Sequence, residues 1–199
     1  MLIASFVFRL QQKNEEGELS RGTLYENGVT LVVAGSETTA TLLTGVTYFL
    51  CKNPERLRRL QHEVRPFFTT DSEITSKSVN DLAYMNAVLS EALRVYPPSP
   101  FGIPRLISNK EGQIVAGHHL PHRVCPRSSI LQSHCVLITL QTRAAIFHHA
   151  AYRYEHNFAR PNEFIPERWL PDAPLEFKSD TRDVLQPFHV GPRGCIGKR

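Results

Sequence analysis

The stretch FHVGPRGCIG, Phe188 to Gly197, places a single cysteine among three glycines, a proline and an arginine. Glycine-rich turns bring backbone N–H groups close to a sulfur atom without steric cost, as an iron-bound thiolate requires. Phe188 can shield the sulfur from water, and Arg193 can pair with a carboxylate of a bound cofactor. The pattern FxxGxRxCxG therefore favours Cys195 as a thiolate ligand of iron.

A pair of charged residues lies upstream of this stretch, in the motif EALR, residues 91–94. Glu91 and Arg94 are three residues apart, so they share one face of the helix that the sequence predicts over residues 78–96. Taken alone, such a pair is typical of an exposed surface ion pair. Arg168 lies in the proline-bounded turn FIPERWLP, and its planar guanidinium can bind Glu91 bidentately beside Arg94.

A long apolar segment, residues 21–50, predicts a helix that is buried on nearly every side. It contains AGSETT, residues 34–39, whose Gly-Ser pair weakens the helix locally and lets a ligand approach the backbone. Glu37 and Thr38 face a ligand, or Thr38 bonds to its own helix beside a salt-bridged Glu37; the residues leave both readings open. Residues 29–50 are long enough to span a membrane, but Glu37 near the middle favours a buried helix of a soluble domain.

The remaining pattern predicts a mainly α fold with a small β patch. Asn53 and Pro54 suit the N-cap and first position of another helix. After Pro97 the chain reads as short strands and turns as far as Leu120. Beyond Asn157 it is proline-rich and irregular, and long loops of this kind usually carry function.

Composition and charge exclude several classes of protein. The 199 residues, 41% of them apolar, suffice for one globular domain, and the net charge of +4 is dispersed rather than gathered into a nucleic-acid-binding stripe. The four cysteines form no CxxC pair, so His134–Cys135 and His148–His149 are better read as scattered residues than as zinc ligands. No disulfide framework and no targeting segment are expected, and the chain looks intracellular.

In this order and at these distances, AGSETT, EALR, PERW and FHVGPRGCIG resemble the cytochrome P-450 family of heme-thiolate monooxygenases, in particular its fungal microsomal-type members. The resemblance covers nearly the whole chain but only the C-terminal part of the family's fold. It implies heme b, iron protoporphyrin IX, with Cys195 as the axial ligand of the iron. It also implies that Glu37 and Thr38 relay protons on the distal face, and that Glu91, Arg94 and Arg168 form a structural triad. The further heme contacts that it implies are Arg193, Arg105, Phe188, Gly191, Gly197, Ala34 and Gly35.

The resemblance also implies a function. A full-length member would hydroxylate a small lipophilic molecule, for example one of secondary metabolism, with molecular oxygen and electrons from an NADPH-dependent reductase at the endoplasmic reticulum membrane. This chain is much shorter than such members, so we expect it to lack the membrane anchor and to be cytoplasmic as written. Its first helix would also lack most packing partners. A catalytically silent fragment or pseudogene product is therefore the rival hypothesis.

Residues 124–143 resemble nothing in the family and interrupt the strand region. The codon pair for Val124–Cys125 can begin with GT, and Gln141 can be encoded by CAG, which match the boundaries of an intron. We therefore interpret this segment as a non-native insertion, a retained intron. A lineage-specific surface loop is the alternative.

Overall fold

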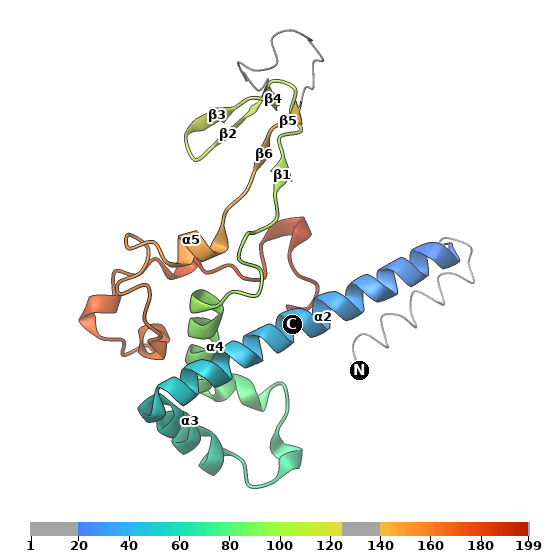
Figure 1. Ribbon diagram of the computed structural model, residues 1–199. Helices are drawn as coiled ribbons and strands as arrows, with labels where there is room; N and C mark the ends of the chain where they lie inside the picture. Colours follow the sequence, from blue (N-terminus) through green and yellow to red (C-terminus); the bar gives the residue numbers. More distant parts are fainter. Residues whose placement is uncertain (1–19, 125–139, 199) are drawn as a thin grey trace.

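The computed structural model describes residues 20–124 and 140–198 of the chain, and its mainly α character with a small β patch confirms the predicted class (Figure 1). Two of its helices, α3 and α4, pack at one end of the long helix α2, and the strands extend away from them. The chain then returns to the helices through α5 and an irregular segment. The helices span Arg21–Lys52 (α2), Pro54–Phe67 (α3), Ala83–Val95 (α4) and His148–Tyr152 (α5).

Helix α2 is continuous, because its hydroxyl side chains bond to its own backbone rather than opening it. Ser20 caps its start, since the Ser20 Oγ accepts a hydrogen bond from the Thr23 N–H at 3.1 Å. The Ser36 Oγ donates to the Val32 carbonyl at 2.8 Å, and the Thr38 Oγ1 donates to the Ala34 carbonyl at 2.7 Å. The bond from Thr38 to its own helix, one part of the alternative reading, is present, whereas no ion pair of the described residues involves Glu37.

Only the C-terminal end of α2 is packed within the part of the chain that the structure describes. Leu50 is buried, and Leu42, Val46 and Phe49 pack against the same core, whereas Leu43 is exposed. Its composition predicted a helix buried on nearly every side, and this prediction is wrong for the described chain. Its segment Gly22–Lys52 is long and apolar enough to cross a membrane, although length and composition do not distinguish such a span from a helix of a soluble protein.

Helix α3 begins as predicted at Pro54, but its cap differs from the expectation. Asn53 occupies the N-cap position and makes no side-chain capping bond. Its Nδ2 instead donates to the Phe49 carbonyl at 2.8 Å, and its Oδ1 accepts from the Arg56 Nη1 at 2.7 Å. Asn53 therefore ties the junction of α2 and α3 together, which helix-start preferences do not predict.

Helix α4 starts later than the predicted helix over 78–96. Ser78–Asp81 forms a separate 3₁₀ turn, and α4 begins at Ala83. The carboxylate of Glu63, on α3, accepts the N–H groups of Tyr84 and Met85 at 2.7 and 2.8 Å, so a neighbouring helix supplies the cap. This contact fixes α4 against α3.

The core lies where α2, α3 and α4 meet the irregular segment. The rings of Phe49 and Phe164 stack with centroids 4.8 Å apart. The core cluster comprises eight buried residues, Leu50, Tyr84, Ala87, Val88, Ala92, Val95, Phe164 and Leu170. This packing joins the C-terminal end of α2 to the helix that carries EALR.

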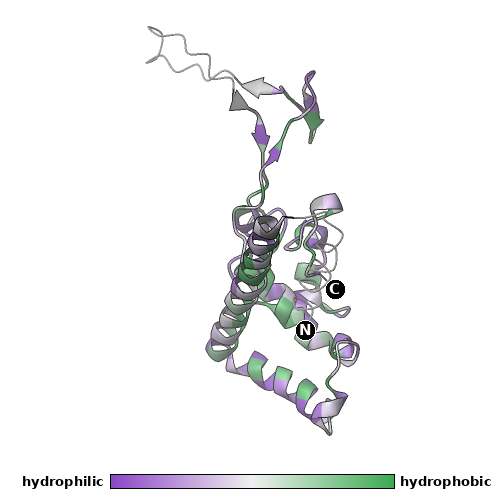
Figure 2. Cartoon of the chain, turned by 90° about the vertical axis from the view of Figure 1, so that its right-hand side faces the viewer, coloured by the Kyte–Doolittle hydropathy of each residue, from purple (hydrophilic) through white to green (hydrophobic). Residues whose placement is uncertain are grey.

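The strands form three short antiparallel pairs in an arm that projects from the helices, as both views show (Figure 2). The paired strands are Arg105–Leu106 (β1) with Arg143–Ala144 (β6), Gln113–Val115 (β2) with His118–Leu120 (β3), and Arg123–Val124 (β4) with Leu140–Gln141 (β5). The predicted insertion falls mainly on residues 125–139, which lie outside the described residues. At its base the Thr142 N–H donates to the His122 carbonyl at 3.1 Å, so the two flanks of the segment lie side by side.

The segment from Asn157 to the end of the described chain is irregular, as predicted. It is built of short 3₁₀ turns that satisfy backbone groups locally. These turns are Pro166–Trp169, Leu175–Phe177, Arg182–Val184 and Gly191–Arg193.

Candidate functional site

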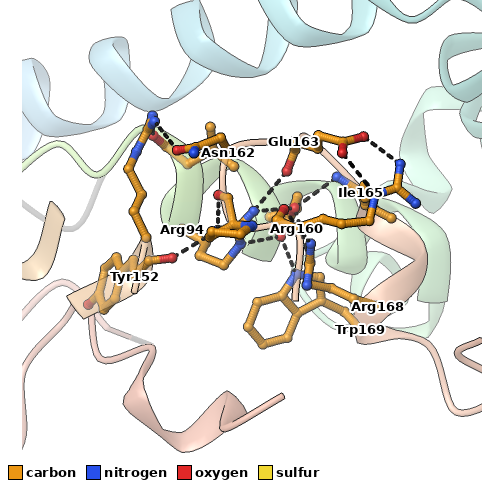
Figure 3. Close-up of polar contacts among 12 residues, drawn as sticks. Arg94, Tyr152, Arg160, Asn162, Glu163, Ile165, Arg168 and Trp169 are labelled. Carbon is orange, nitrogen blue, oxygen red and sulfur yellow. Dashed lines mark hydrogen bonds and ion pairs between the residues drawn. The ribbon is translucent and has the colours of Figure 1, made fainter. Parts of the chain in front are cut away.

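Glu91 is fully buried, and its carboxylate accepts several hydrogen bonds from residues that Figure 3 labels. Arg94 binds it bidentately, because its Nε and Nη2 each donate to one Glu91 oxygen at 2.8 Å. The Glu91 carboxylate also accepts the Ile165 N–H at 2.8 Å and the Trp169 Nε1–H at 2.9 Å. The expectation that this pair alone would be an exposed ion pair is therefore wrong, since neither side chain is accessible to solvent.

Arg168 joins this cluster, but not as a bidentate clamp on Glu91. Its Nε donates to the Glu91 Oε1 at 3.2 Å, while its Nη1 donates to the Asp180 Oδ2 at 2.5 Å. The Arg168 guanidinium also lies over the ring of Phe177, 4.6 Å from the centroid. Arg168 thus links Glu91 to a second buried carboxylate.

Sequence reasoning missed two members of the cluster, Trp169 and Asp180. Trp169 follows Arg168 directly, so the same turn that brings the arginine to Glu91 brings the indole. Asp180 lies outside every motif in an irregular segment, and no spacing rule connects it to Arg168. A composition signal existed only for Trp169, the single tryptophan of the chain.

Arg94 connects the cluster to the chain that leads to the cysteine. Its Nη1 donates to the carbonyls of Tyr152 and Pro161, at 2.9 and 2.6 Å, and its Nη2 donates to the Glu163 carbonyl at 2.8 Å. The hydroxyl of Tyr152 in turn accepts the Gln186 N–H at 3.0 Å, just before the cysteine loop, residues 188–197. Burial raises the pKa of this phenol, so it stays protonated at neutral pH.

The cysteine loop folds back on itself. The Cys195 N–H donates to the Phe188 carbonyl at 2.7 Å, and Gly191 has φ of 76°, a left-handed conformation that favours glycine. His189 has φ of 56°, which is uncommon for a residue with a side chain. A Cβ on Gly197 would lie 3.6 Å from the Cys195 Sγ, which is an ordinary van der Waals contact.

Cys195 and Thr38 line the same cavity, of about 300 Å³, between α2 and the cysteine loop. Its walls are mainly apolar. They consist of Thr38, Thr39, Leu42, Leu93, Pro97, Pro98, Ser99, His148, Pro187, Phe188, Cys195 and Gly197. Four residues that the sequence singled out, Thr38, Phe188, Cys195 and Gly197, are therefore brought together.

Other predicted residues lie elsewhere. Glu37, Ala34 and Gly35 are exposed on α2. Arg105 is exposed on β1, where it pairs with Ala144, so the described structure does not place it on the cavity wall. The predicted heme contacts Gly191 and Arg193 form a 3₁₀ turn next to Cys195.

His148, which the sequence predicted to be a scattered residue, lies on the cavity wall. It is buried, and its Nδ1 lies 3.1 Å from the Ser99 carbonyl, which can only accept, so Nδ1 carries the proton. Its ring lies 4.8 Å from that of His189 in the cysteine loop. Burial, followed by the nearby His189, lowers the pKa of His148, so its ring is neutral at physiological pH. His134 and Cys135, the other pair considered as metal ligands, lie outside the described residues.

Comparison with known families gives a match over the whole chain. The sequence profile described as Cytochrome P-450 matches residues 1–199. A relative from Talaromyces wortmannii, Cytochrome P-450 monooxygenase astA, is 44% identical over 191 residues, which cover 96% of this chain and 34% of the relative. Averantin hydroxylase from Dothistroma septosporum is 43% identical and covers 96% of this chain and 32% of the relative. Trichothecene C-4 hydroxylase from Trichoderma arundinaceum is 39% identical, with 96% and 36% covered.

The fold also matches solved structures. A zebrafish cytochrome P-450 solved with progesterone superposes with a TM-score of 0.67 over 90% of this chain and 35% of that chain, at 24% identity. A second zebrafish structure, with abiraterone, gives a TM-score of 0.68 over 91% and 36%. This likeness shows the fold alone. The chain spans about a third of the length of the curated relatives that it matches.

Proposed function

The chain belongs to the cytochrome P-450 family, and on that premise we propose that the protein is a heme-thiolate monooxygenase that hydroxylates a small lipophilic molecule. The observation that carries the proposal is a single, mainly apolar cavity that is lined both by Cys195, from the cysteine loop, and by Thr38, from α2. The relatives support the reaction type, because several are named as monooxygenases or hydroxylases.

The residues of this cavity fit heme. A planar apolar macrocycle needs apolar walls, which Leu42, Leu93 and Phe188 provide. Its iron needs a soft donor, and Cys195 is the only thiol on the cavity wall among the described residues. A heme iron with an axial cysteine thiolate supplies the oxygen-activating chemistry of such enzymes.

The residues of this chain then hold and insulate the reacting centre. We assign Cys195 as the axial ligand, with Phe188 excluding water from the sulfur. We assign Thr38 a role in proton delivery: its Oγ1 keeps lone pairs that can accept a hydrogen bond in the cavity, and its own proton would become available when it turns away from the Ala34 carbonyl. Glu37, the next residue along α2, is exposed and can exchange protons with solvent.

The remaining assignments follow from the family. Arg193, Arg105, Gly191, Ala34 and Gly35 are the further residues that would hold the heme. Electrons come from an NADPH-dependent reductase, and the oxidant is molecular oxygen. We propose a substrate from secondary metabolism, since relatives are named for hydroxylating averantin and a trichothecene. The complete protein is assigned to the endoplasmic reticulum membrane.

The test uses protein expressed from its complete coding sequence and supplied with hemin. Reduced protein exposed to carbon monoxide should give the long-wavelength Soret band that is characteristic of thiolate ligation. Cys195→Ala should abolish this band, whereas Cys51→Ala, which removes the exposed thiol on α2, should keep it. Retention of the band in Cys195→Ala, or no heme uptake by the unaltered protein, refutes the assignment.

A further inference from the structure

Asp180 occupies a position in the buried cluster that none of the sequence motifs covers. Its Oδ1 accepts the Ala159 N–H at 2.7 Å, and its Oδ2 accepts the Arg168 Nη1 at 2.5 Å. The side chains of Arg168 and Asp180 are both fully inaccessible to solvent. Burying a carboxylate costs free energy unless its charge is compensated, so we ask which charges of the cluster compensate that of Asp180.

The formal charges of the cluster supply that reason. Arg94 and Arg168 contribute two positive charges, whereas Glu91 contributes one negative charge. The three residues of the expected triad therefore leave one positive charge uncompensated in the interior. Asp180 brings the sum to zero, and an arginine left without its full complement of carboxylates would be strongly destabilising.

Asp180 also stands where the chain turns toward the cysteine loop. The next residue, Thr181, donates its N–H to the Asn157 carbonyl at 2.8 Å. Six residues after Asp180, the Gln186 N–H donates to the Tyr152 hydroxyl at 3.0 Å, and the residues that follow form the cavity wall. A shift of Asp180 therefore changes the point from which the loop departs.

We propose that Asp180 is a positioning residue for Cys195, the fourth charged member of the cluster, which neutralises Arg168 and anchors the start of the segment that carries the sulfur. The proposal rests on the assignment of Cys195 as a heme ligand. Asp180 touches neither the cavity nor the sulfur among the described contacts, so it acts only through Arg168 and the backbone.

Asp180→Asn tests the positioning role, because the substitution keeps the shape and removes the charge. In the orientation of Asp180, an asparagine would present its NH₂ group to either the Ala159 N–H or the Arg168 Nη1–H, so one of the two donors loses its acceptor. The measurement uses hemin-loaded protein from the complete coding sequence, at a temperature well below that of unfolding. The fraction of heme that gives the thiolate carbon-monoxide band should fall by at least about half, because breaking a buried ion pair is strongly destabilising.

Glu63→Gln is the matched control. It removes the charge that caps α4 and so destabilises the protein at a distance from the cysteine loop. If Asp180 only stabilised the fold, both variants would lose the thiolate band in proportion to their loss of thermal stability. The proposal expects that Asp180→Asn loses the band and that Glu63→Gln keeps it.

The charge argument is tested without heme. Asp180→Asn leaves the cluster with an excess of one positive charge, and Arg168→Gln leaves it with an excess of one negative charge. The double variant is neutral, so it should unfold at a higher denaturant concentration than either single variant. It also replaces Asp180→Asn in the spectroscopic test if that variant does not fold, and it should then still lose the thiolate band.

The outcomes separate the two proposals. No thiolate band in the unaltered protein refutes the proposed function. A normal band in the unaltered protein and an equal band in folded Asp180→Asn, or in the double variant, refutes the positioning role alone. A double variant that is less stable than both single variants refutes the charge balance.

Discussion

Replacing Glu91 by glutamine should be the most damaging isosteric change in the described structure. Oε1 of Glu91 accepts three hydrogen bonds, from Arg94, Ile165 and Arg168, and its Oε2 accepts two, from Arg94 and Trp169. Glutamine turns one of these acceptors into an NH₂ group that faces at least two N–H donors. It also leaves two guanidiniums with Asp180 as their single carboxylate.

The magnitude follows from these two losses. Breaking a buried ion pair by removing one partner costs about 3–5 kcal/mol. That is a large part of a total free energy of unfolding of roughly 5–15 kcal/mol for a domain, so Glu91→Gln should be marginally folded or unfolded at 25 °C. The expected result is a large shift of the unfolding midpoint to lower denaturant, followed by circular dichroism in urea.

Glu176→Gln provides the comparison. Glu176 pairs with Arg160 at 3.3 Å, but both side chains are about half exposed, at 50% and 47%. An exposed pair of this kind contributes about 0–1 kcal/mol, so the midpoint should barely move. If Glu91→Gln costs no more than Glu176→Gln, the charge cluster does not stabilise this fold and the reasoning is wrong.

Three further predictions concern the rest of the chain. Glu63→Gln should lower the free energy of unfolding by about 1 kcal/mol, because it weakens the cap of α4, and urea unfolding measures this. Deleting residues 124–141 joins two flanks that already lie side by side, so the midpoint of thermal unfolding should stay the same or rise. Sequencing of the mature transcript should show that the segment is removed. Its presence in every transcript contradicts the intron hypothesis. Because the pKa of His148 is lowered from its ordinary 6.5 on folding, its contribution to stability is present above pH 6.5 and is lost as the pH falls through the folded value. His148→Asn should flatten this slope in pH-dependent thermal unfolding, and an unchanged slope contradicts the assignment.

The site could be predicted from the sequence only where its residues share a local motif. Glu91 and Arg94 lie one helical turn apart, so their pairing follows from helix geometry. The turn that carries Arg168 was identified by its prolines. Asp180 could not be found in this way, because its partner is brought to it by tertiary packing of an irregular segment rather than by a repeat or a spacing.

The fold shows the same division between local and tertiary determinants. The helix starting at Pro54 and the short strands and turns before Leu120 were predicted from proline and turn chemistry, but the pairing of residues 113–115 with 118–120 was not. Asn53 occupies the predicted N-cap position of α3, but its side chain does not make the capping bond. The predicted start of the next helix near residue 78 was wrong, because Glu63 on another helix caps α4 and local propensity carries no information about such a partner.

The placement of the sulfur is set from outside its own loop. The described hydrogen bonds within the loop join Cys195 to Phe188 and Gly194 to Gly191, so they fix the shape of the loop but not its position. Its position depends on the bond from Gln186 to Tyr152, whose own carbonyl is held by Arg94 on α4. A change in the buried cluster should therefore alter the environment of the sulfur without altering the sequence of the loop. Tyr152→Phe removes only the hydroxyl, so it should weaken the thiolate band while the unfolding temperature stays close to that of the unaltered protein. An unchanged band at unchanged stability contradicts this chain of contacts.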